Sequence, residues 1–442
     1  MPTEPSDLAG EHVEGLYDGD PIYEWERLDR HRTEFAVSLR ALRQHLPPPP
    51  ARVLDCGGGP GRFSIELARM GYEVTLFDLS AENLRLASAK AADAGVTIAR
   101  YEHGTATDLS RFPDETFDAV ALMGPLYHLL ENENRQRALL ETRRVLKAGG
   151  VLFAAFITRY APVRYTAAHD MATWPADRSE ELESILERGM QLPQGDPGST
   201  FVACFYHPGE VAPLLCGAGF EMVSLLGVEG LVSMIEDSVN VLQGEAWEAW
   251  EEINYRVAAD PSIHGGVEHL LAVAVKPRWR AVLCHIAQAL DRAGIPYKVV
   301  GGTAAALHGV DLPTVRDIDI EMDTGDTYRF QELFAPHVVR PVALSESSAY
   351  RSHFGCFSFD GLIVEVMGDL HRRQEDAWVP SMTLTETTVD LDGTPVRTSW
   401  LEEETLAYIR RGRLERAAQC LARCDQDRLL ALLHGEQPTV VL

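Results

Sequence analysis

The stretch from Val53 to Gly61 (VLDCGGGPG) constrains the fold of this chain more than any other segment. It reads as a buried strand that runs into a glycine-rich turn and then into a helix. Glycine lets the backbone turn tightly and lie against a ligand, and the following helix offers free N–H groups. A second strand, 73–77, ends at Asp78, where a carboxylate suits the two hydroxyls of a ribose. The segment therefore predicts a βαβ unit that binds a nucleoside.

The order of the glycines distinguishes between two kinds of cofactor. A pyrophosphate site would use G-x-G-x-x-G, whereas the glycines here alternate and follow an acid, Asp55. A carboxylate at this position suits the ammonium group of a methionine moiety and would repel a pyrophosphate. The block resembles motif I of the class I S-adenosylmethionine-dependent methyltransferases; the alternative is a tight turn that binds no ligand.

Length and charge narrow the range of functions. The chain has 442 residues, too many for one ordinary core, so two or three domains are expected. Its net charge is −26, from 66 acidic residues against 40 Lys and Arg. This balance argues against nucleic-acid binding and is compatible with small-molecule or cationic substrates. Seven scattered cysteines indicate reduced thiols in a cytoplasm, and no signal peptide or membrane span is visible.

Strand and helix patterns alternate through the first half of the chain. Strands are predicted near 52–56, 73–77, 97–101, 117–122 and 151–157, and helices near 32–46, 61–70, 81–93 and 134–146. A helix from 208, a strand at 220–228, a helix at 236–258 and a strand at 270–275 follow. The alternation predicts an α/β fold with a doubly wound parallel sheet that binds ligands at the carboxyl ends of its strands.

The resemblance to the methyltransferases covers roughly residues 12–276. It implies a Rossmann-like domain at 1–277, with the irregular segment 158–206 as a substrate cap, and S-adenosylmethionine as cofactor. It points to bacterial enzymes that methylate small molecules. The residues it implies for cofactor binding are Tyr17, Asp55, Gly57, Gly58, Gly59, Asp78, Leu79, Thr105, Ala106 and Met123.

Two features of this cofactor site stay open. Thr105 stands where the family most often has an acid that contacts adenine, so either the backbone around Ala106 binds adenine or Asp108 substitutes. Tyr17 belongs to a predicted N-terminal lid over the cofactor, although a plain amphipathic helix explains that segment almost as well.

His128 follows the fourth predicted strand, in Met123-Gly-Pro-Leu-Tyr-His-Leu129. In enzymes of this family that strand end faces the transferable methyl group. A neutral imidazole can take a proton near pH 7, so His128 is a candidate general base. The alternative is that Tyr127 and His128 only shape the wall of the pocket.

The second half of the chain carries its own signal. A strand at 297–300 runs into Gly301-Gly302-Thr303 and a helix, and Arg316-Asp-Ile-Asp-Ile320 reads as a strand. Asp317 and Asp319 then share one face, about 7 Å apart, where two carboxylates can hold a divalent metal. The helix after the glycines can hold a triphosphate. A third strand, 362–367, places Glu365 in an apolar run, which is costly unless the acid has a role.

Together these residues resemble the nucleotidyltransferases of the DNA polymerase β superfamily, and aminoglycoside and lincosamide nucleotidyltransferases among them. The resemblance covers about 281–435 and implies a smaller α/β (α+β) domain at 278–442 with a helical C-terminal tail. It implies a nucleoside triphosphate, a hydroxyl acceptor and Mg²⁺. The implied nucleotide-binding residues are Gly301, Gly302, Thr303 and Arg316; the implied metal ligands are Asp317, Asp319 and Glu365. Glu365 is also the implied base, and Asp369 is the alternative third acid.

The two resemblances predict a bifunctional enzyme, in which methyl transfer to a small molecule and nucleotidyl transfer to a hydroxyl share one chain. Two alternatives remain. The C-terminal domain could be a non-catalytic nucleotide-binding regulator, or the pair could form a toxin–antitoxin-like modifier of protein or RNA ends. The three acids in the second half favour catalysis over regulation, and the net acidity argues against RNA.

Overall fold

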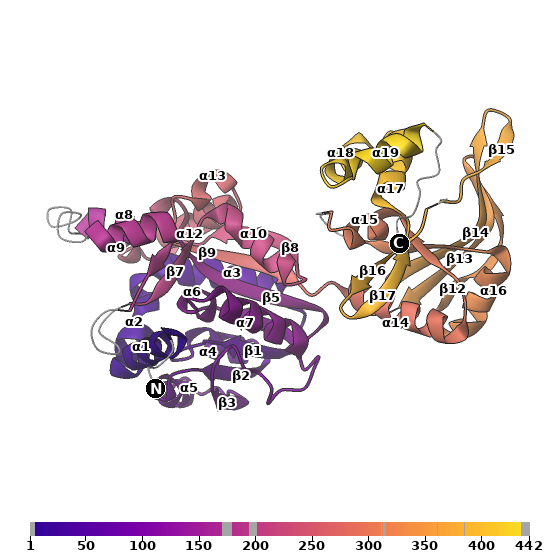
Figure 1. Cartoon of the computed structure of the whole chain (residues 1–442). Helices are drawn as coiled ribbons and strands as arrows, with labels where there is room; N and C mark the ends of the chain where they lie inside the picture. The colour runs from indigo at the N-terminus through magenta and orange to yellow at the C-terminus, as the bar shows by residue number, and fades with distance from the viewer. Residues whose placement is uncertain are drawn as a thin grey trace. The chain divides into compact units, whose positions relative to one another are not determined.

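The computed structural model describes residues 5–169, 179–193, 201–310, 312, 315–359, 361–383 and 385–434. The chain divides into two compact units, Met1–Pro277 and Arg278–Leu442 (Figure 1). Each unit has its own sheet and its own apolar core.

The sheet of the first unit has its central strand, β1, where the strand order reverses. The parallel order is β3–β2–β1–β4–β5, while β9 pairs antiparallel with β5 and β8 antiparallel with β9. The strands are β1 (Arg52–Cys56), β2 (Glu73–Asp78), β3 (Arg100–His103), β4 (Phe117–Leu122), β5 (Leu146–Thr158), β6 (Met190–Gln191), β7 (Ala203–Tyr206), β8 (Glu221–Gly227) and β9 (His269–Val275). The short β7 pairs with the carboxyl end of β5, and β6 pairs with β7.

Apolar residues on both faces of this sheet are buried. Val53 and Phe153 point to one core, and their neighbours Leu54 and Ala154 point to the other, all with no exposed surface. Strands that bury both faces read as continuous apolar runs, as these do. The helices are α1 (Pro5–Gly19), α2 (Pro21–Arg30), α3 (Arg32–His45), α4 (Arg62–Arg69), α5 (Ala81–Asp93), α6 (Pro125–His128), α7 (Asn132–Val145), α8 (Ala161–His169), α9 (Ser179–Glu183), α10 (Pro208–Gly217), α11 (Glu236–Asn240), α12 (Gly244–Val257) and α13 (Pro261–His264), with short helical turns η1 (Ser184–Arg188) and η2 (Gly230–Val232).

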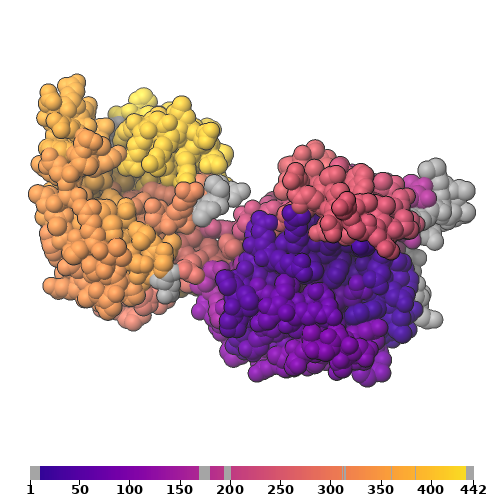
Figure 2. Space-filling view, turned by 180° about the vertical axis from the view of Figure 1, so that it is seen from behind, coloured from indigo at the N-terminus to yellow at the C-terminus, as the bar shows by residue number. Residues whose placement is uncertain are grey.

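The N-terminal helices pack against helices from much later in this unit. Arg32 at the start of α3 donates a hydrogen bond to the carbonyl of Leu242 and lies over the ring of Trp247 in α12, 3.6 Å from its centroid. Figure 2 shows these indigo and pink segments side by side on one face of the unit. The contact holds the start of α3 against α12.

The second unit is a mixed sheet with the order β12–β13–β14–β11–β10–β17–β16, and β15 pairs with β14. Its strands are β10 (Lys298–Val300), β11 (Asp317–Met322), β12 (Val338–Glu346), β13 (Tyr350–Phe359), β14 (Leu362–Gln374), β15 (Ala377–Pro380), β16 (Thr387–Leu391) and β17 (Thr394–Thr398). Its helices are α14 (Arg278–Ala293), α15 (Gly301–Leu307), α16 (Thr324–Leu333), the turn η3 (Ala335–His337), α17 (Leu401–Arg410), α18 (Leu414–Leu421) and α19 (Gln426–Leu433). A small apolar cluster that includes Ala305, Leu401 and Tyr408 joins α15 to the C-terminal helices.

The predicted fold class is confirmed in both units, and three details are corrected. β3 occupies Arg100–His103 and not 97–101. The helix expected at 236–258 is split into α11 and α12, because the chain turns at Gly244, which has φ of +55°. The segment 158–206 is not irregular in its described part, which holds α8, α9, η1, β6 and β7; its portions 170–178 and 194–200 lie outside the described residues.

Among the described ranges, no helix combines the length and the apolar character needed to cross a membrane.

Candidate functional sites

The turn after β1 packs against the start of α6, the helix that follows β4. Gly57 has φ of +74°, and a Cβ on it would lie 2.5 Å from Cδ of Pro125. Its N–H donates to the carbonyl of Phe77 in β2, at 2.7 Å. Only glycine fits this position, because it combines positive φ with a close approach to another segment. The turn therefore borders the crevice that opens where the strand order reverses.

Asp55 lies beneath this turn and does not line the cavity above it. Its side chain is 1% exposed, and its Oδ2 accepts a hydrogen bond from Oγ of Ser64 in α4, at 2.7 Å. A Cβ on Gly58 would lie 2.6 Å from the same carboxyl oxygen. Burial raises the pKa of Asp55 to about 6. Neither Asp55 nor Gly58 lines the cavity, so the direct contacts with a cofactor that were expected of them are not seen in this arrangement.

Asp78 stands at the carboxyl end of β2 and closes the glycine turn. Its Oδ2 accepts the N–H of Gly59 and its Oδ1 accepts the N–H of Ser80, both at 2.8 Å. Burial raises the pKa of this carboxyl, opposed by those two backbone N–H groups. Asp78 is thus held in one orientation by the backbone on both sides of it, and it borders the cavity.

A cavity of about 1170 Å³ occupies the crevice at the carboxyl edge of the sheet. It brings together most of the residues that the sequence pointed to: Tyr17, Gly57, Gly59, Asp78, Leu79, Thr105, Ala106, Met123 and His128 all line it. Of the two alternatives for an adenine contact, the segment at Thr105 and Ala106 borders the cavity, whereas Asp108 is exposed outside it and caps the N–H of Ser110.

Asn83 is a cavity residue that the sequence analysis missed. It lies in the first turn of α5 and is 1% exposed, and its Oδ1 has no hydrogen-bond partner in the described part of the chain. A buried amide oxygen without a partner is costly. Its position beside Asp78 fits a polar ligand such as an adenosyl group, whose hydroxyls can satisfy both side chains. An Asn in the first turn of the helix after Asp78 was the only sequence signal.

Tyr17 and His128 join α1 to α6 across the mouth of this cavity. The hydroxyl of Tyr17 and Nε2 of His128 are 2.8 Å apart, and Nδ1 of His128 is 2.6 Å from the carbonyl oxygen of Val202. A carbonyl only accepts, so Nδ1 carries the hydrogen and Nε2 accepts the hydrogen bond from Tyr17. Burial lowers the pKa of His128 to about 4 and raises the pKa of Tyr17. The imidazole is therefore neutral, with its accepting nitrogen directed at the phenol.

A second cavity of about 850 Å³ adjoins the first. The two share the lining residues Tyr17, Glu24, Arg27 and Tyr127. Helices α2, α8 and α11 contribute to its walls, and its lining includes six carboxylates and several aromatic rings. No local sequence pattern pointed to it, because its residues come from segments far apart in the chain.

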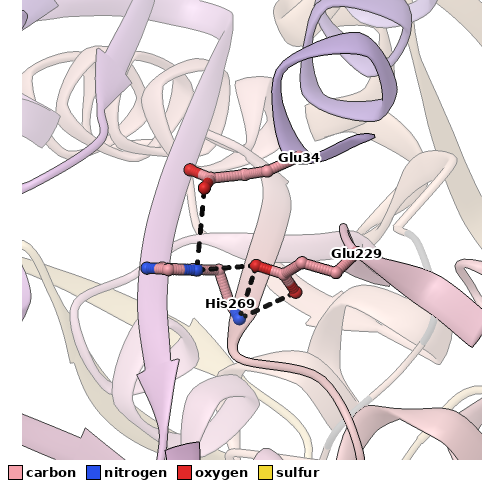
Figure 3. A group of neighbouring side chains, drawn as sticks. All are labelled: Glu34, Glu229 and His269. Carbon is pink, nitrogen blue, oxygen red and sulfur yellow. Dashed lines mark hydrogen bonds and ion pairs between the residues drawn. The ribbon is translucent and has the colours of Figure 1, made fainter. Parts of the chain in front are cut away.

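Buried charged side chains between these cavities form one ion-pair network (Figure 3). Nδ1 of His269 lies 2.7 Å from Oε1 of Glu229 and 3.8 Å from Oε2 of Glu34. Glu34 also pairs with Arg27 through two hydrogen bonds, at 2.8 and 3.0 Å. Although burial opposes it, the carboxylates of Glu34 and Glu229 raise the pKa of His269 to about 9.

Ion pairs account for this network without a metal ion. Among the described residues, Glu34, Glu229 and His269 form the one group of three whose ligand atoms lie within 4.8 Å of one another. A metal needs a deprotonated imidazole, whereas the neighbouring carboxylates favour protonated His269. Both carboxylate oxygens of Glu34 already accept hydrogen bonds from Arg27. The three side chains therefore serve to hold α3 against β9.

In the second unit, three acids gather on neighbouring strands. Asp319 in β11 is the register partner of Glu365 in the parallel strand β14, and Asp317 lies two residues before it on the same face. All three line a cavity of about 500 Å³. Gly301 has φ of +70°, and a Cβ on it would lie 2.6 Å from Oδ2 of Asp319, so a side chain there would displace the carboxylate.

Mutual repulsion marks this group as suited to a cation. Burial and the charges of Asp317 and Glu365 raise the pKa of Asp319 to about 7, and burial and Asp317 raise the pKa of Glu365. Carboxylate oxygens are the ligands that Mg²⁺ prefers. The donor set therefore fits a divalent cation, although the three carboxylates do not all lie within 4.8 Å of one another.

Three arginines from the C-terminal helices face the acids, and the sequence analysis missed them. Arg411, Arg413 and Arg416 surround the turn between α17 and α18 and line the same cavity. A Cβ on Gly302 would lie 3.4 Å from Nη1 of Arg416. The signal was present as the basic run Arg410-Arg-Gly-Arg-Leu-Glu-Arg416 in a strongly acidic chain.

The remaining predicted residues of this unit divide into two groups. Gly302 and Arg316 line the cavity. Thr303 is buried and donates to the carbonyl of Asp317 at 2.7 Å, so it holds β11 and does not line the cavity. Gly301 also lines the cavity, and its N–H hydrogen-bonds to the carboxylate of Glu404 in α17. Asp369 is exposed and lies outside the cavity lining, whereas Glu365 is within it.

Comparisons with known proteins match each unit separately. The family model described as "Methyltransferase domain" matches residues 53–150, and the one described as "Aminoglycoside-2''-adenylyltransferase" matches residues 282–419. Among curated proteins, the chain is 31% identical over 192 residues to the ubiquinone biosynthesis O-methyltransferase of Xanthomonas axonopodis, covering 43% of this chain and 72% of that protein. It is 33% identical over 144 residues to the glycine/sarcosine N-methyltransferase of Aphanothece halophytica, covering 32% and 52%.

Two solved structures resemble the units. A Thermotoga maritima structure assigned as a nucleotidyltransferase has a TM-score of 0.30 and 31% identity, covering 36% of this chain and 96% of that one. A SAM-dependent methyltransferase from Methanosarcina mazei has a TM-score of 0.36 and 22% identity, covering 54% and 97%. At these TM-scores the family assignment rests on the sequence matches.

Protonation of His128 is expected to destabilise the first unit in acid. Its pKa is about 4 in the folded protein and 6.5 in the unfolded chain, so the unfolded state binds more protons between these values and stability falls as the pH drops. Between pH 7.5 and pH 5 the imidazole accounts for about 2 kcal/mol of lost stability. Urea denaturation of wild type and His128→Gln at the two pH values measures it. If wild type and His128→Gln lost the same free energy of unfolding between the two pH values, the buried neutral imidazole would be contradicted. The control is His103→Gln, because His103 lies on the surface.

Proposed function

We propose a bifunctional transferase, on the premise that this chain belongs to the class I S-adenosylmethionine-dependent methyltransferases and carries a C-terminal domain of the aminoglycoside nucleotidyltransferase family. The first unit transfers a methyl group to a small molecule. The second transfers a nucleotidyl group from a nucleoside triphosphate to a hydroxyl, with Mg²⁺.

One observation carries the methyl-transfer proposal. The 1170 Å³ cavity lies between the glycine turn and α6, with Asp78 and the unpartnered Oδ1 of Asn83 on its wall and the Tyr17–His128 pair at its mouth. These residues fit S-adenosylmethionine: two polar side chains are available for the ribose, and Thr105 and Ala106 border a place for the adenine. The segment 158–206, which supplies Val202 to orient His128, acts as the substrate cap.

When bound, the cofactor supplies an electrophilic methyl group on a sulfonium sulfur. The chain holds the acceptor and moves its proton. The Tyr17 oxygen takes the proton from an acceptor hydroxyl while its own proton passes to Nε2 of His128. The proton of the acceptor hydroxyl would thus leave through the imidazole, and the acceptor oxygen would be free to take the methyl group that the bound cofactor supplies. The low pKa of His128 keeps that nitrogen free to accept at neutral pH.

The nucleotidyl-transfer proposal rests on the 500 Å³ cavity, whose lining includes both a group of acids and a group of arginines. Asp317 and Asp319 would hold Mg²⁺, which would offset charge on the triphosphate. Arg411, Arg413 and Arg416 present guanidinium groups that recognise phosphate oxygens. Glu365 takes the proton of the acceptor hydroxyl. A bond forms from that oxygen to the α-phosphorus, the bond to the bridging oxygen breaks, and pyrophosphate leaves.

Asp78→Asn is expected to weaken S-adenosylmethionine binding at least tenfold, because the charged acceptor of a hydrogen bond is worth about 1.5–3 kcal/mol. Isothermal titration calorimetry of both proteins measures the change. Asp93→Asn, on the exposed end of α5, should bind as the wild type does. If S-adenosylmethionine did not bind to the wild-type protein, the methyltransferase proposal would be contradicted.

Metal-dependent binding of a nucleoside triphosphate is expected in the second unit. Asp317→Asn/Asp319→Asn should abolish the Mg²⁺ dependence, and Arg411→Gln should weaken binding roughly tenfold or more, since each loses a charge-assisted contact. The neighbouring Arg410→Gln is the matched control, because Arg410 is exposed and does not line the cavity. Calorimetric titration of each triphosphate with and without Mg²⁺ measures both. Metal-independent binding that survives the double substitution would favour a non-catalytic nucleotide-binding domain.

A further inference from the structure

The cavity next to the cofactor cavity has the chemistry of a binding site for a cation. It shares Tyr17, Glu24, Arg27 and Tyr127 with the cofactor cavity, so a molecule within it would meet the cofactor cavity beside the Tyr17–His128 pair. On the proposed function, on which this inference rests, it is the place for the methyl acceptor.

Two carboxylates on its wall have hydrogen-bonding capacity to spare. Glu236 at the start of α11 is 7% exposed; its Oε2 pairs with Nδ1 of His31 at 2.7 Å, while its Oε1 has no partner among the described residues. The Glu268 carboxylate, just before β9, makes no hydrogen bond or ion pair within the described part of the chain. A buried carboxylate oxygen without a partner, as Oε1 of Glu236 is, is costly unless a ligand completes it; the Glu268 carboxylate is half-buried.

The cations already present do not neutralise this cavity. Arg27 is engaged by Glu34 and Glu24, and His269 by Glu229 and Glu34. Glu181 has a partner of its own, because it accepts a hydrogen bond from Gln191. Without it, and even with both histidines protonated, the lining still holds five carboxylates against four cationic side chains: Asp20, Glu24, Glu236, Asp237 and Glu268 against Arg27, Arg30, His31 and His269. Burial and the nearby Glu229 and Glu34 raise the pKa of Glu236 to about 7, even though His31 opposes them. The excess negative charge is consistent with a missing cation.

Aromatic rings complete the surroundings. Tyr23, Tyr127, Tyr165, Phe201 and Phe205 line the same cavity. The faces of aromatic rings attract organic cations, and rings together with carboxylates recognise an alkylammonium group better than a hydrated inorganic ion. The volume of about 850 Å³ is that of a site for a small molecule and not for a polymer.

We propose that this cavity binds a small organic cation, a molecule with a protonated amine, whose ammonium group is held by Glu236 and Glu268. The methyl acceptor is thus an amine-bearing compound, anchored by its charge while a different group, a hydroxyl or an unprotonated nitrogen, faces the cofactor cavity. A neutral or anionic compound of the same shape would leave Oε1 of Glu236 and the Glu268 carboxylate without a partner and bind more weakly.

Matched ligands test this directly. Three phenols that differ in the charge of the side chain are titrated into the full-length protein by calorimetry: tyramine, 4-ethylphenol and 3-(4-hydroxyphenyl)propionate. Two cyclic polyols, the cationic 2-deoxystreptamine and the neutral myo-inositol, are titrated as well. The result then does not depend on the phenol scaffold. Each titration is run with and without S-adenosylhomocysteine, and each is repeated with Glu268→Gln, Glu236→Gln and the exposed control Glu245→Gln.

At least one cation is expected to bind ten times or more tightly than its neutral counterpart, with the anion weakest. Glu268→Gln should reduce that preference roughly tenfold, and Glu245→Gln should leave it intact. Glu236→Gln removes the charge partner of His31 and could disturb the local structure. Glu268 makes no such pair, so Glu268→Gln tests the inference independently. Equal binding of neutral and cationic ligands, no binding of either cation, or a preference that survives both substitutions would overturn the inference.

Failure of the methyltransferase proposal would look different. It would appear as absence of S-adenosylhomocysteine binding, while the preference for cations is still measured in the protein without cofactor.

Discussion

The close approach of Gly57 to Pro125 is the contact on which the first site depends. It brings the turn after β1 within van der Waals distance of the helix after β4, at the one place where the strand order reverses. Two groups that line the cavity lie next to that contact. Asp78 closes the turn from β2, while α6 presents His128 to Tyr17. A side chain at position 57 would separate the two segments and open the crevice.

The second unit uses the same device for different chemistry. Gly301 follows β10 with positive φ, and the absence of its side chain leaves room for the carboxylate of Asp319. In both units a glycine just after a strand lets another group, the ring of Pro125 in the first and the carboxylate of Asp319 in the second, lie closer to the backbone than any other residue would permit. The units differ in charge. The first holds ordered carboxylates next to neutral polar groups, while the second sets carboxylates against three arginines.

Local sequence predicted what local backbone geometry determines. The glycine turn, the acid at the end of β2 and the alternating aspartates of β11 were all visible because spacing along one segment places them. The parallel, doubly wound sheet of the first unit followed from the alternation of strands and helices. The surroundings of Asp55 and of the Gly301 N–H were not predicted, for a tertiary reason: Gly58 covers the first, and Glu404, more than a hundred residues away in sequence, accepts a hydrogen bond from the second. The arginines around Gly412 and the carboxylates Glu236 and Glu268 reach their cavities through packing of distant segments, which no window of sequence contains.

The most direct test is a crystal structure of the full chain with S-adenosylhomocysteine, Mg²⁺ and a non-hydrolysable nucleoside triphosphate. The account predicts an adenosyl group between Asp78 and the Thr105–Ala106 segment, and a triphosphate between the arginines at 411, 413 and 416 and the acids Asp317 and Asp319. A cofactor bound outside the cavity beside Gly57, or a triphosphate bound away from Asp319, would contradict it.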